Sequence, residues 1–413
     1  MGAAMSTSDA ERHSRWLTNN RFRLLENGEQ FFPAVFAAIG NARREILIET
    51  FILFEDRVGC ELQHQLILAA KRGVSVDLTI DGYGSPSLSP AFINGLTEAG
   101  VRVHVYDPQP RILGLRTNIF RRLHRKLVAI DGEFAFVGGI NYAVDQLSNS
   151  GPTGKQDYST WIHGSLVEVI RQFMKDEAAR YTKRRQSERI KRRKNWELGQ
   201  SNGEALFVTR DNHRHRDDIE RHYRIAIRAA QHEVILCNAY FFPGYRLLQQ
   251  LLHAARRGVK VKLILQGEPD MPAAQAWTEM LYAPLLQAGV EIHEYCRRPL
   301  HGKVAVIDHH WSTVGSSNLD PLSLALNLEA NVIIRDQAFT RELHARLQRI
   351  LDEDCVRVDP TSARRRSRFD ILLHTLVYHC TRHFPSWAGW LPSHKPRLHS
   401  INAKICDESG GQG

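Results

Sequence analysis

Two widely separated runs of residues carry the same chemical groups in the same order. Each run has a histidine, a lysine two residues later, an aspartate, a pair of small residues and an asparagine. The runs are His124, Lys126, Asp131, Gly138-Gly139 and Asn141, and then His301, Lys303, Asp308, Gly315-Ser316 and Asn318. Every position of the second run lies 177 residues after its counterpart. Such agreement is difficult to attribute to chance.

Paired histidines and lysines suit displacement at phosphorus. The attacking and leaving atoms lie on opposite sides of the phosphorus, so one imidazole can attack while another protonates the leaving oxygen. Ammonium and amide groups can hold the charged non-bridging oxygens. A lysine two residues from a histidine lies on the same side of a strand, and lysine is rarely buried without a partner. We therefore predict catalytic roles for both histidine-lysine pairs, supporting roles for Asn141 and Asn318, and no metal ion or cofactor.

Two carboxylates are candidates for orienting the histidines. A catalytic histidine needs an acceptor at its second ring nitrogen. Asp157 lies 33 residues after His124, and Glu329 lies 28 residues after His301. Each precedes an apolar strand, where a carboxylate without a partner would be costly. We predict that both are orienting acids, with ordinary salt bridges as the alternative.

Internal repetition indicates how the chain positions these groups. The helix end, glycine and strand start at 69–74 return at 254–259, and Ala99-Gly100-Val101 returns as Ala288-Gly289-Val290. Both halves alternate strands with helices of about 10 to 15 residues, which predicts an α/β fold with a parallel or mixed sheet. We expect a first half at 1–203 that ends in a basic linker, a second half at 204–359, and a tail at 360–413.

Positive charge is concentrated outside these halves. The 413 residues carry a net charge of +10, and Arg180 to Lys194 holds nine basic residues against one glutamate. The tail adds eight basic residues against three acidic ones, and apolar residues recur at helical spacing between Phe369 and Cys380. Such segments bind nucleic acid or an anionic membrane, or remain solvated. The tail pattern fits either an amphipathic helix at a membrane surface or a helix packed on the protein's own core.

Membrane spans and thiol chemistry are not expected. No apolar run approaches the length of about 18 residues that crosses a bilayer. The six cysteines lack C-x-x-C spacing, which argues against a zinc ribbon or disulfide framework. We therefore expect a chain that stays in the cytoplasm or lies on a membrane without crossing it.

The two runs resemble the signature of the phospholipase D superfamily, H-x-K-x4-D-x6-G-[GS]-x-N, without a departure. The resemblance implies a duplicated α/β/α sandwich, with two halves related by a pseudo-twofold axis and one active site between them. It also implies a phosphohistidine intermediate, with His124 as nucleophile and His301 as acid and base. Asp131 and Asp308 join the catalytic candidates at lower rank, because the family's motif aspartates are more often structural.

Longer stretches are similar to the bacterial cardiolipin synthases of that superfamily. They include Glu49-Thr50-Phe51, Asp81 to Pro86, Asn238 to Gly244 and Gly315 to Asp320. The resemblance implies transfer of a phosphatidyl group between phosphatidylglycerol molecules or from another phospholipid donor, with release of glycerol. A lipid hydrolase or a phosphodiester nuclease is the alternative.

The resemblance also implies where the chain acts. Its partners would be phospholipid substrates and an anionic membrane surface, with no nucleic acid, on the cytoplasmic side of a bacterial inner membrane. Between Gly100 and His124 there are 12 more residues than between Gly289 and His301, and the extra stretch mixes apolar and basic residues. It could enter a membrane interface or fold on its own domain. The oligomeric state stays open.

Overall fold

The structure is a computed structural model, and it describes residues 15–108, 111–112, 115–116, 121–148, 150–151, 154–182, 203–212, 214–267, 278–359 and 398–401. The basic linker beyond residue 182 and the predicted tail helix lie outside the described residues, as do the side chains at 111–120. Whether these segments contact a membrane therefore stays a prediction, and so do the domain boundaries.

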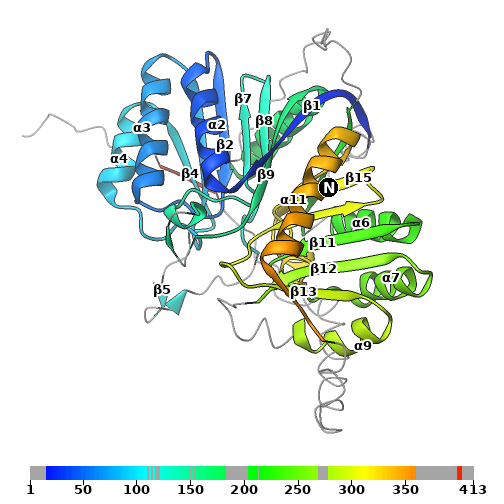
Figure 1. The fold of residues 1–413 in the computed structure, drawn as a ribbon. Coiled ribbons are helices and arrows are strands. Elements are labelled where there is room, and N and C mark those ends of the chain that lie inside the picture. Colours follow the sequence, from blue (N-terminus) through cyan, green and yellow to red (C-terminus); the bar gives the residue numbers. More distant parts are fainter. Residues whose placement is uncertain are drawn as a thin grey trace, which may run out of the picture.

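Sixteen strands of the described residues form one mixed sheet (Figure 1). Those of the first half are β1 (Leu17–Glu26), β2 (Glu45–Thr50), β3 (Ser75–Asp81), β4 (Arg102–Tyr106), β7 (Leu127–Ile130), β8 (Phe134–Gly138), β9 (Tyr158–Gly164) and β18 (Leu398–Ile401). Those of the second half are β10 (Gly203–Arg210), β11 (Glu233–Asn238), β12 (Lys260–Gln266), β13 (Glu291–Tyr295), β14 (Lys303–Ile307), β15 (Trp311–Gly315), β16 (Glu329–Arg335) and β17 (Cys355–Arg357). The short strands β5 (Arg111–Ile112) and β6 (Leu115–Arg116) pair separately.

The strand order has a pseudo-twofold symmetry about the middle of the sheet. From the centre outward, the first half runs β1-β9-β8-β7-β2-β3-β4-β18 and the second runs β10-β16-β15-β14-β11-β12-β13-β17. Strands β2, β3 and β4 are parallel, as are β11, β12 and β13, and the other pairs are antiparallel. The halves join where β1 pairs with β10, at Leu17 with Ala205 and Asn20 with Gly203. This arrangement confirms the predicted duplicated α/β fold.

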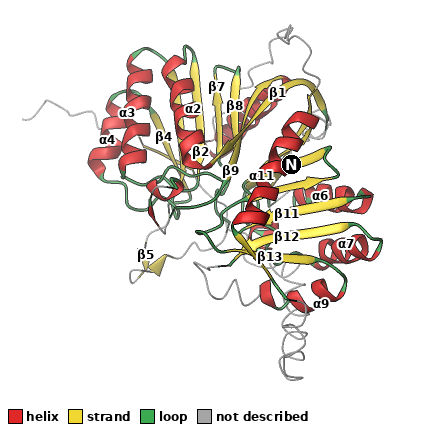
Figure 2. Ribbon diagram, in the orientation of Figure 1, coloured by secondary structure: helices red, strands yellow, loops and turns green. Residues whose placement is uncertain are grey.

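Helices cover both faces of the sheet (Figure 2). The outer helices of the first half are α2 (Asn27–Asn41), α3 (Arg57–Lys71) and α4 (Pro90–Glu98), and those of the second are α6 (Asp218–Ala229), α7 (Tyr245–Arg256), α9 (Tyr282–Gln287) and α10 (Pro321–Ala325). Helix α3 begins at a side-chain cap from Asp56 and ends before Gly73, whose φ of 86° suits glycine. Gly258 ends α7 in the same way, as the sequence repeat predicts.

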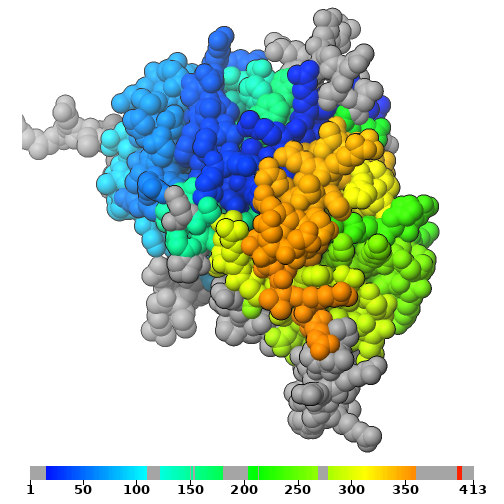
Figure 3. Space-filling view, in the orientation of Figure 1, coloured from blue at the N-terminus to red at the C-terminus, as the bar shows by residue number. Residues whose placement is uncertain are grey.

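Two central helices, α5 (Ser165–Thr182) and α11 (Gln337–Glu353), pack at the junction of the halves. The ring of Phe173 on α5 lies 5.3 Å from that of Phe207 on β10, and Phe339 on α11 lies 5.9 Å from Phe22 on β1. Each central helix thus packs on a strand of the opposite half, and one apolar core spans the junction. In Figure 3 the orange surface of α11 adjoins the blue surface of the first half. Within the described residues, no helix is both long enough and apolar enough to span a membrane.

Candidate active site

The two motif histidines lie at the junction of the halves. His124 precedes β7, and His301 precedes β14. The backbone N–H of His124 donates to the carbonyl of Leu328 at 3.0 Å, and that of His301 donates to the carbonyl of Gln156 at 2.8 Å. Leu328 precedes β16 in the second half, and Gln156 precedes β9 in the first. Each motif is therefore bonded to the opposite half.

The predicted orienting acids also contact the histidines across this junction. Nδ1 of His124 lies 3.0 and 3.1 Å from the two carboxylate oxygens of Glu329, and Nδ1 of His301 lies 2.5 Å from Oδ2 of Asp157. Both acids are almost completely buried. Asp157 follows His124 and Glu329 follows His301 along the chain, but in the structure each histidine pairs with the acid of the other half.

The small residues of the motifs differ because the two acids differ. The hydroxyl of Ser316 donates to Oε2 of Glu329 at 2.5 Å. The matching residue of the first half is Gly139, where an added Cβ would lie 2.4 Å from Oδ1 of Asp157. A serine at 139 would therefore collide with the acid. The backbone N–H of Tyr158 donates to Asp157 at 2.7 Å instead.

The motif lysines are buried beside the histidines. Lys126 donates to the carbonyl of His124 at 2.7 Å, and Lys303 donates to that of His301. Burial lowers the pKa of Lys126 to about 7 and also lowers the pKa of Lys303, and nearby carboxylates only partly offset this effect. Because both lysine charges act on both histidines, the four side chains belong to one electrostatic site.

The surroundings of both histidines favour the neutral imidazole. Burial, with help from the lysines, lowers the pKa of His124 to about 4 and that of His301 well below its usual range. Burial raises the pKa of Asp157 to about 6. A neutral imidazole that donates from Nδ1 to a carboxylate presents an unprotonated Nε2, which is the state that a nucleophile requires. An anionic phosphate would raise both imidazole pKa values.

The structure does not bring the motif aspartates to this site, which corrects their inclusion among the catalytic candidates. Asp131 follows the last residue of β7, and roughly 20 Å of extended chain separates it from His124. Its carboxylate accepts from the backbone N–H groups of Arg43, Arg44 and Glu45 at 2.8 to 2.9 Å.

Asp308 makes the same contacts in the second half. It accepts from the backbone N–H groups of Gln231, His232 and Glu233 at 2.7 to 2.9 Å. Each aspartate thus holds the loop that begins a neighbouring strand, β2 for Asp131 and β11 for Asp308.

The motif asparagines are buried and incompletely bonded. Oδ1 of Asn141 accepts from the backbone N–H of Ile52 at 3.1 Å, and its Nδ2 has no protein partner among the described residues. Oδ1 of Asn318 likewise has none there. An unsatisfied buried polar atom is costly, and a ligand oxygen would satisfy the Nδ2 donor of Asn141, whereas the Oδ1 acceptor of Asn318 would need a ligand hydroxyl. Their supporting role stays a prediction.

Several residues beside His124 were not singled out from the sequence. The Phe51 ring lies 4.8 Å from the His124 ring, and the Arg122 guanidinium lies 4.1 Å from the centre of the Tyr83 ring. Asp81 accepts from the backbone N–H of Leu123 at 2.7 Å and so fixes the segment before His124. Phe51, Asp81 and Tyr83 all lie in the stretches that carried the resemblance, which was the available signal.

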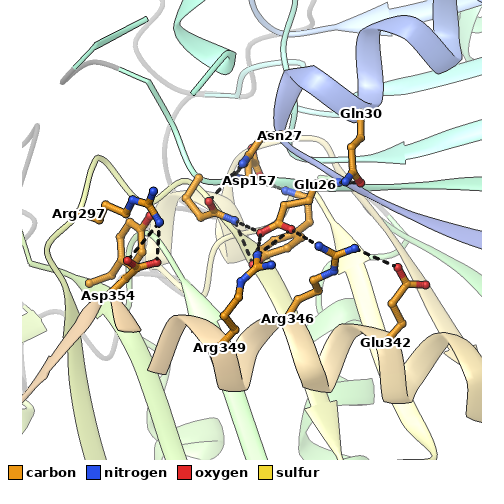
Figure 4. A network of polar contacts seen from close by, with 12 residues as sticks. Glu26, Asn27, Gln30, Asp157, Arg297, Glu342, Arg346, Arg349 and Asp354 are labelled. Carbon is orange, nitrogen blue, oxygen red and sulfur yellow. Dashed lines mark hydrogen bonds and ion pairs between the residues drawn. The ribbon is translucent and has the colours of Figure 1, made fainter. Parts of the chain in front are cut away.

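Another set of contacts ties α11 to the first half beside Asp157 (Figure 4). Glu26, at the end of β1, accepts from Arg346 at 3.1 Å and from Arg349 at 2.9 Å. The amide of Gln156 also donates to Glu26, at 2.8 Å. Asn27 accepts from the backbone N–H of Asp157 at 2.8 Å. The acid that holds His301 thus sits against a polar network that spans both halves.

Two halves of one mixed sheet, each giving an H-x-K motif to a shared site, define a member of the phospholipase D superfamily. The model of the family described as "Cardiolipin synthase, PLD-like domain" matches residues 35–175 and 223–351, which fall in the two halves. The chain therefore belongs to the cardiolipin synthase family.

Individual proteins agree with this placement. The chain is 53% identical over 392 residues to cardiolipin synthase B of Salmonella typhi, and 52% identical to cardiolipin synthase B of Escherichia coli strain K12. Each alignment covers 94% of both chains. Among solved structures, phosphatidylserine synthase of Haemophilus influenzae matches with a TM-score of 0.67 and 12% identity, over 94% of this chain and all of that one. The latter likeness concerns the fold alone.

Proposed function

We propose that this chain is a phosphatidyltransferase that makes cardiolipin from two molecules of phosphatidylglycerol and releases glycerol. The observation that carries the proposal is the pair of neutral imidazoles at one junction, each held by a buried acid of the opposite half. The relatives named cardiolipin synthase B, which match over nearly the whole chain, support the choice of lipid substrates.

In the first step, Nε2 of His124 attacks the phosphorus of one phosphatidylglycerol. A P–N bond forms and the bond from phosphorus to the glycerol head-group oxygen breaks. His301 gives that oxygen a proton, so glycerol leaves neutral. The bound phosphate, by raising the imidazole pKa values, favours the protonated state that His301 needs for this transfer.

In the second step, a hydroxyl of another phosphatidylglycerol attacks the phosphohistidine. His301 takes the hydroxyl proton as the new P–O bond forms and the P–N bond breaks, which restores both histidines. One phosphodiester replaces another, so no external energy source is required. Water can compete with the lipid hydroxyl, and the dryness of the site determines the balance.

The lysines stabilise the charge on the non-bridging oxygens. They donate to the backbone carbonyls of the histidines in their own motifs, so they are positioned beside the reacting groups. The phosphate charge offsets the burial that lowers their pKa values and keeps both lysines protonated during turnover. Asn141 offers an additional buried amide donor.

We place the enzyme on the surface of an anionic membrane, on the cytoplasmic side. Support comes from the basic linker and tail of the sequence, since each lysine or arginine near an anionic surface contributes about 1 kcal/mol.

Incubation with phosphatidylglycerol vesicles and product analysis by mass spectrometry tests the reaction. Wild-type protein should produce cardiolipin and glycerol, and His124→Gln should not. Label from a phosphatidyl donor should be trapped on the protein as an acid-labile, base-stable adduct. Full transfer by His124→Gln would refute the assigned nucleophile. Phosphatidic acid as the sole product would indicate a hydrolase, and cleavage of labelled DNA would indicate a nuclease.

A further inference from the structure

A second cluster of side chains lies in the second half. It is at the end of β14 that is opposite His301 of the active site. Glu233 opens β11, His309 lies in the turn between β14 and β15, and His344 lies on α11. One potential ligand atom from each residue lies within 4.8 Å of the others. Three separate elements therefore bring two imidazoles and a carboxylate together.

The contacts within the cluster leave a suitable set of donors. Nε2 of His344 lies 2.8 Å from Oε2 of Glu233, and the rings of His309 and His344 are 4.2 Å apart. Lys262 bonds the other carboxylate oxygen, Oε1, at 2.8 Å. Glu233 can therefore offer Oε2 as one ligand while Lys262 holds its orientation, as outer partners of metal-binding carboxylates do.

The first half offers an internal comparison, because the duplicated fold places corresponding residues at the same location. Glu45 opens β2 there, and it pairs with Arg171 and with Lys175 at 2.8 Å. An added Cβ on Gly132, in the turn after Asp131, would lie 3.3 Å from Arg171. A glycine and an arginine thus occupy the positions that His309 and His344 occupy in the second half.

Three differences between the halves favour a bound cation in the second, whereas Lys262, which stands where the first half has Asp77, adds a positive charge beside Glu233. His344 replaces the permanently charged Arg171, Gln348 replaces Lys175, and His309 replaces Gly132. His309 also has a φ of 56°, a conformation that favours glycine, and Gly132 has a φ of 65°. The second half thus has two imidazoles where the first half has a glycine and a fixed positive charge.

We propose that Glu233, His309 and His344 bind a divalent transition-metal ion of the zinc class. Two imidazoles and a carboxylate are typical zinc ligands, and water can supply the fourth position. Ligand atoms around tetrahedral zinc lie roughly 3.4 Å apart, so the cluster must contract. The exposed turn residue His309 can move to achieve this. The ion would join α11 to β11 and to the β14–β15 turn, away from the phosphoryl chemistry.

The test uses the full chain, stripped of metal. It is prepared without a polyhistidine tag, because a tag would add weak zinc-binding sites to those that the chain's own 20 histidines already offer. Zinc chloride is titrated by calorimetry, and cobalt(II) reports tetrahedral coordination through its visible absorption. His309→Gly restores the residue of the first half. His344→Arg recreates the ion pair that Arg171 makes with Glu45, so this variant should fold. His310→Ala, a change in the neighbouring histidine of the same turn, is the matched control.

We expect wild type and His310→Ala to bind one zinc ion with equal affinity and to unfold at a higher temperature when zinc is present. His309→Gly and His344→Arg should each raise the Kd at least tenfold and lose the cobalt absorption and the thermal shift. Absence of stoichiometric uptake by the wild type would overturn the proposal. Unchanged zinc binding by either variant would overturn it too, because the ion would then occupy other histidines.

Discussion

Crossed pairing of histidines and acids makes a sharp prediction about the variants Glu329→Gln and Asp157→Asn. Each change keeps the shape of the side chain but removes the charge that accepts from Nδ1. Glu329 should then act on His124 and Asp157 on His301, although each acid shares a half with the other histidine.

The expected loss follows from the burial and geometry of these pairs. A hydrogen bond to a charged group contributes about 1.5 to 3 kcal/mol, which corresponds to roughly 10-fold to 150-fold in rate. An amide can also present its NH2 group to Nδ1 and stabilise the wrong tautomer, which in a serine protease triad costs about 10⁴-fold. Since both acids are buried, water cannot easily replace them. We expect each variant to lose about 10² to 10⁴ in kcat while it remains folded.

Two measurements separate crossed from same-half pairing. Transfer from phosphatidylglycerol in mixed micelles gives kcat and KM. Long-range ¹⁵N–¹H correlation spectra report the tautomer of each ring, with assignments from His124→Gln and His301→Gln. Glu329→Gln should shift the His124 resonances and spare those of His301, and Asp157→Asn should do the reverse. The opposite result, or equal shifts of both rings, would refute the reasoning.

Three more outcomes are expected. Because the pKa of Asp157 is raised to about 6, its carboxyl gains a proton as the pH falls through that value, and kcat/KM should drop on the acid side. An unchanged acid limb of the pH profile in Asp157→Asn would contradict this. Asp131→Asn loses acceptor capacity at the start of β2 and should lower the free energy of unfolding by about 1 to 3 kcal/mol. The kcat/KM of the folded protein should be preserved. A large drop in kcat would return Asp131 to the catalytic residues. Glu26→Gln weakens the network across the halves and should lower the urea midpoint by an amount equivalent to about 1 to 2 kcal/mol. Glu342→Gln, which breaks an exposed pair with Arg346 within α11, should cost less than about 0.5 kcal/mol. Equal effects of these last two changes would show that Glu26 does not join the halves.

Much of the fold was predictable because duplication presents each sequence pattern twice. The repeated helix ends at Gly73 and Gly258 and the constant offset between the motifs indicate two α/β halves. Local spacing also placed each lysine beside its histidine. Asp157 and Glu329 could be selected because a carboxylate before an apolar strand requires a partner.

The remaining features depend on contacts between distant segments, which spacing does not encode. Which acid meets which histidine is decided where β1 pairs with β10. The structural role of Asp131 depends on three backbone N–H groups about 90 residues earlier in the chain, and nothing within the motif indicates them. No spacing in the sequence indicates the Glu233 cluster, because its imidazoles come from a turn and a helix that only the fold brings together.

The junction of the halves also suggests how such a site originated. An ancestral chain of half this length, with one motif and one acid, could have completed the site only by pairing with an identical copy, because each histidine takes its acid from the partner half. In that symmetric dimer both histidines would have had identical surroundings. Within one chain the two sites need not be identical: Ser316 bonds Glu329 in one, and Gly139 lies against Asp157 in the other.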